Sequence, residues 1–244
     1  MSRIWQYLLE RFHPGLMGAV ALVLALGCLN PFTISRWLIT AAALFLYLLQ
    51  LRIFDEFKDA DHDKKFYPSR PVPRGLVTFE ELNLLLIIVL LGQIILLASS
   101  RASWSLFVVL QAYTWLMRQE FGFKEWLRRH FTVYLISHEV VVLPLFLYLM
   151  SITRWASVIQ SIILGLSLFS LEVARKTLPG RIGANDTYVE QYGKKDAFIL
   201  SLAILMSMIG LFFTTKESKL LLVPALALSF FANIYVGIRQ LQSK

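Results

Sequence analysis

Long apolar runs constrain the fold of this 244-residue chain more than any other feature of its sequence. A run of about 18 or more apolar residues with few charges is typical of a helix that spans a lipid bilayer. Runs of roughly this kind fall at residues 14–30, 36–54, 82–99, 103–117, 131–150, 155–171, 197–214 and 219–238. Lipid offers the backbone no hydrogen-bond partners, and the alternating pattern of barrel strands is absent, so each run is expected to be a helix.

The composition agrees with a membrane protein and argues against several other classes. Hydrophobic residues make up 57% of the chain and charged residues 16%, and the mean hydropathy is +0.62. These values disfavour a water-soluble globule, a disordered chain and a coiled coil. The single cysteine, Cys28, excludes a disulfide framework. We therefore predict an all-α polytopic membrane protein, with about eight transmembrane helices around a central cavity.

The basic residues predict how the chain is oriented in the membrane. A net charge of +8 also raises the possibility of a nucleic-acid partner, but lysines and arginines in a polytopic protein usually mark the cytoplasmic loops. Most of the 24 basic residues lie at the two termini and in the loops after the second, fourth and sixth runs. Both termini and these loops are therefore expected in the cytoplasm, with no nucleic-acid partner. No cleavable signal is evident, which favours a bacterial inner membrane.

The two longest acidic loops occupy equivalent places in the order of the apolar runs. Residues 55–80 follow the second run and residues 172–196 follow the sixth, and both loops begin with acidic residues. We therefore interpret the chain, 1–244, as a single membrane domain made of two four-helix blocks, 1–130 and 131–244. In this interpretation, the two acidic loops face each other across the central cavity.

The first acidic loop carries three aspartates, Asp55, Asp59 and Asp63, at intervals of four residues. On a continuous helix they fall within an arc of about 80°. Like charges at this spacing repel, and they follow the second run where the end of its helix is already negative. A solvated acidic helix end is one interpretation. A bound divalent cation would offset the repulsion, and a site of oxygen donors alone suits Mg²⁺ held together with substrate phosphates.

Basic residues accompany these acids. Prolines and a glycine between residues 68 and 75 are expected to end the helix and bring Arg70 and Arg74, with Lys58, close to the aspartates. Guanidinium groups beside carboxylates that bind a metal are typical of a diphosphate site. The alternative is that these cations only determine the membrane topology.

The stretch Asp55-x-x-x-Asp59-x-x-x-Asp63, followed by Arg70-Pro71-Val72-Pro73-Arg74-Gly75, resembles the first aspartate-rich motif of the UbiA superfamily of intramembrane prenyltransferases. The resemblance implies an all-helical fold around a central cavity, usually with one span more than this sequence shows. It also implies Mg²⁺ as cofactor and an isoprenyl diphosphate as substrate, with membrane lipids around the protein. Most members transfer the prenyl group to an aromatic or other lipophilic acceptor.

The second motif of the family, D-x-x-x-D, is altered here to Glu172-Val173-Ala174-Arg175-Lys176. Glu172 replaces the first acid, and Lys176 stands where the second acid is expected. A positive charge cannot bind Mg²⁺, but it can contact a phosphate. The resemblance thus implies that Asp55, Asp59, Asp63 and Glu172 are catalytic and bind Mg²⁺, and Asp186 is a further candidate ligand. The residues expected to hold the diphosphate are Lys58, Arg70, Arg74, Arg175, Lys176, Lys124 and Arg128.

The leading expectation is a Mg²⁺-dependent prenyltransferase. Two alternatives stay open: a UbiA-type terpene cyclase that acts on the prenyl diphosphate alone, and a non-catalytic lipid-binding or transport protein on the same scaffold. Ionisable residues inside spans are functional candidates by default, which singles out His138 and Glu139. Aromatic rings stabilise cations, and the candidates are Tyr113, Trp115, Tyr134 and Phe169. Interhelical hydrogen bonds are expected for Gln93, Gln111 and Asn233.

Overall fold

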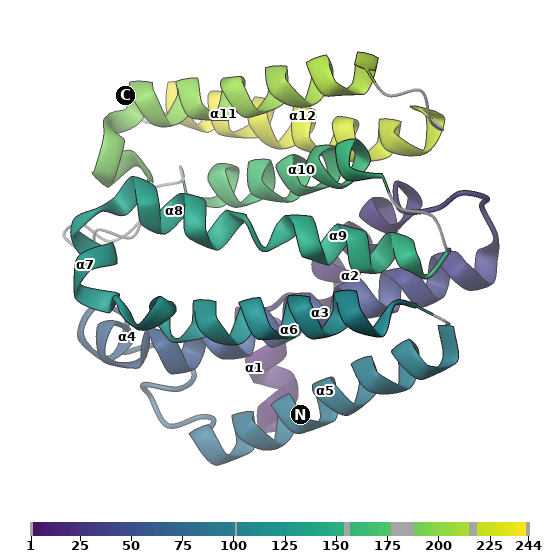
Figure 1. Ribbon diagram of the computed structural model, residues 1–244. Helices are drawn as coiled ribbons and strands as arrows, with labels where there is room; N and C mark the ends of the chain where they lie inside the picture. Colours follow the sequence, from purple (N-terminus) through teal and green to yellow (C-terminus); the bar gives the residue numbers. More distant parts are fainter. Residues whose placement is uncertain (1, 101, 154–156, 177–187, 215–218, 243–244) are drawn as a thin grey trace.

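The structure is a computed structural model that describes residues 2–100, 102–153, 157–176, 188–214 and 219–242. Over these residues the regular elements are all helices (Figure 1), which confirms the expected fold class. The helices are α1 Arg3–Arg11, α2 Pro14–Leu26, α3 Ile34–Lys58, α4 Ala60–Phe66, α5 Phe79–Ser100, α6 Trp104–Arg118, the 3₁₀ turn η1 Glu120–Gly122, α7 Lys124–Arg129, α8 Phe131–Glu139, α9 Val142–Ser151, α10 Val158–Lys176, α11 Tyr188–Thr214 and α12 Lys219–Gln242. Each predicted apolar run falls on one of these helices, or on the pair α8 and α9.

Several of the described helices are suited to cross a membrane. By length and hydropathy these are α3, α5 and the combined segment Phe131–Ser151, and the pair α1–α2, bent by 57°, qualifies if it forms one span. Shorter apolar helices cover Val158–Ala174, Ile199–Phe213 and Leu220–Tyr235. On α5, Ile88 and Ile95 are 57% and 66% exposed, as expected for a face that contacts lipid. The chain is an integral membrane protein, and the number of eight spans stays a prediction.

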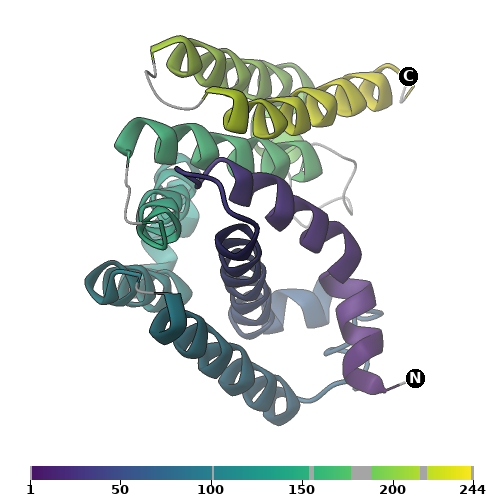
Figure 2. The same ribbon diagram turned by 90° about the vertical axis from the view of Figure 1, so that its right-hand side faces the viewer.

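The long helices form a closed circuit of contacts. Helix α3 packs against α2 and α6, α6 packs against α9, α9 against α10, α10 against α12, and α12 returns to α2. Helix α5 lies against α3, and α11 lies against α10 and α12 (Figure 2). The main core lies inside this circuit, and its fully buried leucines include Leu24, Leu44, Leu145, Leu164 and Leu222.

Polar side chains inside the spans pair with one another between helices, as predicted. Gln93 on α5 donates from Nε2 to Gln50 Oε1 on α3 at 2.8 Å, and Gln111 on α6 donates to Gln93 Oε1 at 2.8 Å. Asn233 on α12 donates to Ser170 Oγ on α10 at 2.9 Å. These bonds join neighbouring helices at points where an unpaired amide in lipid would be costly.

Gln50, Gln93 and Gln111 form a closed triangle, in which each amide bonds to both of the others. Replacing Gln50 with leucine leaves the Gln93 and Gln111 amides short of partners. We expect this substitution to lower the free energy of unfolding by about 1–2 kcal/mol. Denaturant unfolding in detergent micelles measures it, with Ser99→Ala, an exposed hydroxyl on α5, as the control. An unchanged stability for Gln50→Leu would contradict the role assigned to the cluster.

Candidate functional site

The first aspartate motif lies across a break between two helices. Helix α3 ends at Lys58, and Asp59, with φ −98° and ψ 11°, leads into α4. The hydrogen-bond ladder continues, because the backbone N–H groups of Asp59 and Asp63 donate to the carbonyls of Asp55 and Asp59 at 2.9 and 2.8 Å. The single continuous helix expected for this motif is nevertheless wrong, because the backbone of Asp59 departs from helical geometry and divides α3 from α4. Asp55 belongs to α3 and Asp63 belongs to α4.

Asp55 and Asp59 form the more accessible part of the motif. The Asp55 side chain is 44% exposed and lies 3.7 Å from Arg52 and 3.9 Å from Lys58. Burial raises the pKa of the half-buried Asp59 carboxyl; Lys58 opposes this shift, whereas the neighbouring carboxylates of Asp55 and Asp63 add to it. A cation bound between the carboxylates of Asp55 and Asp59 would relieve this repulsion. Their hard oxygen donors are those that Mg²⁺ prefers.

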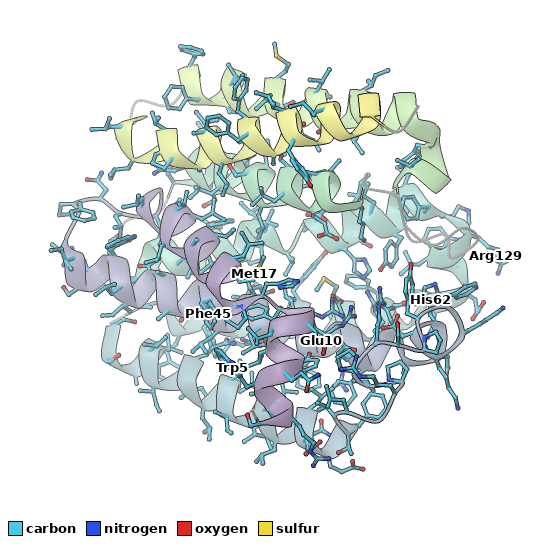
Figure 3. The ribbon with its side chains drawn as sticks, turned by 180° about the vertical axis from the view of Figure 1, so that it is seen from behind. Trp5, Glu10, Met17, Phe45, His62 and Arg129 are labelled. Atoms are coloured by element: carbon cyan, nitrogen blue, oxygen red, sulfur yellow. The ribbon has the colours of Figure 1, made fainter. Side chains whose placement is uncertain are left out.

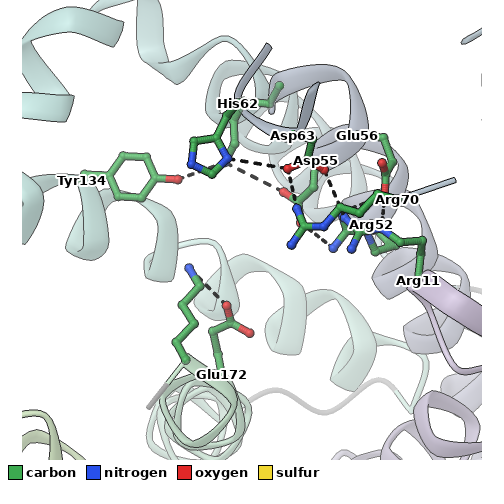
Figure 4. A network of polar contacts seen from close by, with 11 residues as sticks. Arg11, Arg52, Asp55, Glu56, His62, Asp63, Arg70, Tyr134 and Glu172 are labelled. Atoms are coloured by element: carbon green, nitrogen blue, oxygen red, sulfur yellow. Dashed lines mark hydrogen bonds and ion pairs between the residues drawn. The ribbon is translucent and has the colours of Figure 1, made fainter. Parts of the chain in front are cut away.

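Asp63 is held in a buried ion-pair network (Figure 4). Its side chain is 3% exposed, and it pairs with Arg70 and, at 3.5 Å, with Arg11. The same network contains Glu56, which is 1% exposed and lies 2.7 Å from Arg11 and 3.0 Å from Arg52. Asp63 is thus brought close to Arg70 as expected, but its oxygens already contact two guanidinium groups. Its role as a metal ligand stays a prediction and would require those groups to release it.

Helix α1 supplies Arg11 to this network, although in the sequence this arginine is only one of the basic residues near the N-terminus that predict the membrane topology. Two local signals point to the helix. Ser2 caps it by accepting a hydrogen bond from the Trp5 N–H at 3.2 Å, and Ile4, Tyr7 and Leu8 have helical spacing. Figure 3 views this face of the molecule, with Trp5 and Glu10 labelled on α1. The local sequence pattern does not reveal that Arg11 of this helix pairs with the distant Asp63.

The loop after α4 places the two arginines of the motif differently. Arg70 stacks its guanidinium 3.6 Å above the centre of the Tyr67 ring and pairs with Asp63. Arg74 pairs with Glu10 of α1 at 2.8 Å, away from the aspartates. Gly75 has φ +76°, a left-handed conformation that favours glycine, and this turn directs the chain toward α5. Of the two, Arg70 is therefore the better placed to meet a diphosphate beside Asp55 and Asp59.

Lys58 connects the aspartates to α8. Its Nζ donates a hydrogen bond to Tyr134 Oη at 3.0 Å, and the Tyr134 ring stacks on His138 with 4.0 Å between ring centroids. From the sequence, Tyr134 and His138 are separate candidates, one for its ring and one for its place inside a span. The structure joins both of them to the aspartate motif through Lys58.

The second acidic segment lies on α10. Glu172 pairs with Lys176 at 3.3 Å, and Figure 4 shows Glu172 apart from the network of α1, α3 and α4. Glu139 of α8 lies close enough to interact electrostatically with both residues. Within the described residues, no group of three or more His, Cys, Asp and Glu side chains is gathered closely enough to hold a metal ion.

Of the remaining predicted residues, the structure describes the side chain of Lys124 but not those of Arg128, Arg175 and Asp186. Lys124 is exposed on the short helix α7. Asp186 lies outside the described residues, as do the side chains of Arg128 and Arg175. Their expected roles stay predictions.

Comparison with known proteins identifies the fold. The sequence matches no protein-family profile and no curated protein. A solved structure from work on digeranylgeranylglyceryl phosphate synthase in membranes is similar, with a TM-score of 0.56 and 15% sequence identity over 99% of this chain and 97% of that chain. That synthase is a UbiA-superfamily prenyltransferase. The chain described here therefore has the fold of the UbiA-like membrane prenyltransferases, the family that its first aspartate motif resembles.

Proposed function

We propose that this protein is a Mg²⁺-dependent intramembrane prenyltransferase, which ionises an isoprenyl diphosphate and transfers the prenyl group to a lipophilic acceptor. The observation that carries the proposal is the pair of carboxylates, Asp55 and Asp59, beside Lys58 at the end of α3. This pair lies on a fold that the UbiA-like membrane prenyltransferases share. The end of α3 is also the end predicted to face the cytoplasm, where a water-soluble diphosphate headgroup is accessible.

The donor set suits magnesium. Mg²⁺ in proteins is usually bound by one or two carboxylates, with waters and substrate phosphates filling its other positions. Asp55 and Asp59 would hold the ion, Glu172 would approach from α10, and Asp63 is the least accessible of the four acids. When bound, Mg²⁺ supplies positive charge that neutralises the diphosphate as it leaves.

The basic residues would hold the diphosphate itself. Lys58 presents its ammonium between Asp55 and Tyr134, and Arg70 lies at the edge of the same cluster. Both form charge-assisted hydrogen bonds to phosphate oxygens readily. From the opposite side, Lys176 and Arg175 of α10 are proposed as further contacts, and Lys124 and Arg128 as residues that approach from α7. Arg74 pairs with Glu10 of α1, and it could contact the diphosphate only if that ion pair opened.

Product analysis tests the proposal. Purified protein is incubated with geranyl, farnesyl or geranylgeranyl diphosphate, with and without Mg²⁺, and with and without a bacterial lipid extract. We expect consumption of the diphosphate and a prenylated lipid only when both Mg²⁺ and the extract are present, as detected by mass spectrometry. A hydrocarbon or terpene alcohol formed without the extract would instead indicate a cyclase. Binding of the diphosphates with no turnover would indicate a lipid-binding protein and reject the enzymatic proposal.

A further inference from the structure

Among the described residues, no group forms a hydrogen bond with the buried ring nitrogen Nε2 of His138. Its Nδ1 lies 2.8 Å from the backbone carbonyl oxygen of Tyr134, one helical turn earlier. Its Nε2 is shielded from solvent and is not hydrogen-bonded to any group in the described part of the chain. Buried polar atoms are nearly always hydrogen-bonded, because leaving one unpaired destabilises the fold. An unpaired nitrogen inside a membrane span is therefore a candidate contact for a ligand.

The hydrogen bonds of His138 assign its tautomer. A carbonyl oxygen can only accept, so the bond to Tyr134 requires that Nδ1 carry the proton of the neutral ring. The nearby Ser137 hydroxyl, 3.4 Å from Nδ1, donates its own proton to the same carbonyl at 2.9 Å and cannot supply one to the ring. Nε2 therefore presents a free lone pair. Its complement is a donor such as a hydroxyl group.

The position of His138 connects this lone pair to the proposed reaction. The ring stacks on Tyr134, whose hydroxyl accepts a hydrogen bond from Lys58. The imidazole also lies within electrostatic range of Asp55 and Lys58 on α3 and of Lys176 on α10. The ring is therefore near residues of both acidic segments, and in our proposal a molecule bound at Nε2 would lie close to the site proposed for the diphosphate.

We propose that His138 Nε2 binds the hydroxyl group of the prenyl acceptor and removes its proton during transfer, an inference that rests on the proposed function. The hydroxyl oxygen uses a lone pair to form a bond to the allylic carbon of the prenyl group. The bond from that carbon to the diphosphate oxygen breaks, and its electron pair leaves with the diphosphate. The hydroxyl proton moves to Nε2, and the resulting imidazolium later releases it to water. The acceptor is thus a lipophilic alcohol or phenol, and the product is an ether.

Phe121 covers the same ring. Its side chain packs against His138 in a T-shaped arrangement, with 6.0 Å between ring centroids. In η1, the φ values of Glu120, Phe121 and Gly122 are +49°, +54° and +76°. Glu120 and Phe121 thus adopt left-handed conformations although neither is a glycine. Because Nε2 is shielded from solvent, a neighbouring side chain has to move before an acceptor can reach it, and Phe121 is the candidate. The shielding also keeps water from the base, as a reaction with a carbocation requires.

Two substitutions of His138 test the inference. His138→Phe keeps an aromatic ring but removes the base, and His138→Gln keeps a hydrogen-bond acceptor that cannot take the proton. Ser137→Ala is the matched control on the same turn. Each variant is given geranylgeranyl diphosphate, Mg²⁺ and a lipid extract freed of amine-bearing lipids, either untreated or acetylated to cap its hydroxyls. Isothermal calorimetry measures binding of the diphosphate, mass spectrometry measures transfer, and thermal unfolding in detergent checks the fold.

Both His138 variants are expected to bind the diphosphate as the wild type does and to transfer it at least about 10²-fold more slowly. Wild type and Ser137→Ala should prenylate the untreated extract and leave the acetylated extract unchanged. Transfer at the wild-type rate by a folded His138 variant would overturn the inference, as would prenylation of the acetylated extract. Either result leaves the proposed function standing. A wild-type protein that neither binds nor consumes the diphosphate would reject both.

Discussion

Replacing Asp59 with asparagine is expected to lower the rate of prenyl transfer by at least about 10²-fold while the helices stay folded. Asp59 and Asp55 lie on successive turns, so the substitution removes one of the two carboxylates proposed to hold Mg²⁺. An amide of the same size preserves packing at the junction of α3 and α4, but it carries no charge. The rate of diphosphate consumption is measured over a range of Mg²⁺ concentrations. Asp59→Asn is expected to require a higher Mg²⁺ concentration than the wild type to reach half of its maximal rate.

Asp61→Asn is the matched control for this prediction. Asp61 is exposed on α4, two residues beyond Asp59, and belongs to none of the ion pairs described above. Its substitution removes the same charge from the same loop, so general weakening of the local negative potential would affect both variants equally. Equal losses in Asp59→Asn and Asp61→Asn, or wild-type turnover in Asp59→Asn, would contradict the assignment of Asp59 to the metal.

Replacing Glu56 with alanine is expected to produce the largest loss of stability among the charged residues of the site. Glu56 is almost fully buried between Arg11 at 2.7 Å and Arg52 at 3.0 Å. Removing it leaves two guanidinium groups near each other in a region from which water is largely excluded. Breaking a buried pair in this way typically costs about 3–5 kcal/mol. Thermal and denaturant unfolding in detergent micelles measure the change.

The ion pair between Glu10 and Arg74 provides the comparison, because its separation of 2.8 Å is nearly the same but it lies at the surface. Water and salt screen such a pair, so Glu10→Ala is expected to leave the unfolding midpoint almost unchanged. The two variants therefore separate the effect of burial from the effect of pairing. Similar unfolding midpoints for Glu56→Ala and Glu10→Ala would show that the network around Glu56 does not hold α1 in place.

The helices could be predicted from the sequence because an apolar run in lipid can satisfy its own backbone hydrogen bonds only as a helix. Glutamines in the spans were equally predictable, since an amide in lipid requires a polar partner, and Gln93 and Gln111 do pair as expected. Regular periodicity was less reliable for the aspartates. Their spacing of four fits a continuous helix, but the chain breaks at Asp59, and Asp63 turns to Arg11 and Arg70.

The partners of the site residues could not be predicted from local patterns. Arg11 and Asp63 are far apart in the sequence, and they are brought together by the packing of α1, which is bent by 57° from α2, near α4. The link from Lys58 through Tyr134 to His138 likewise joins α3 to α8 by tertiary packing. The sequence does show that a histidine inside a span is unusual. It does not show that Nε2 lacks a hydrogen-bond partner among the described residues, since that depends on how neighbouring helices pack around the ring.

Among the described helices, the circuit closes where α12 meets α2. During synthesis from the N-terminal side, α2 is therefore made and inserted many residues before its partner α12. Until α12 arrives, the side of α2 that will contact it faces lipid or the insertion machinery. Assembly of the enclosing wall consequently waits until α12 has been made, and a chain that ends before residue 219 cannot complete it.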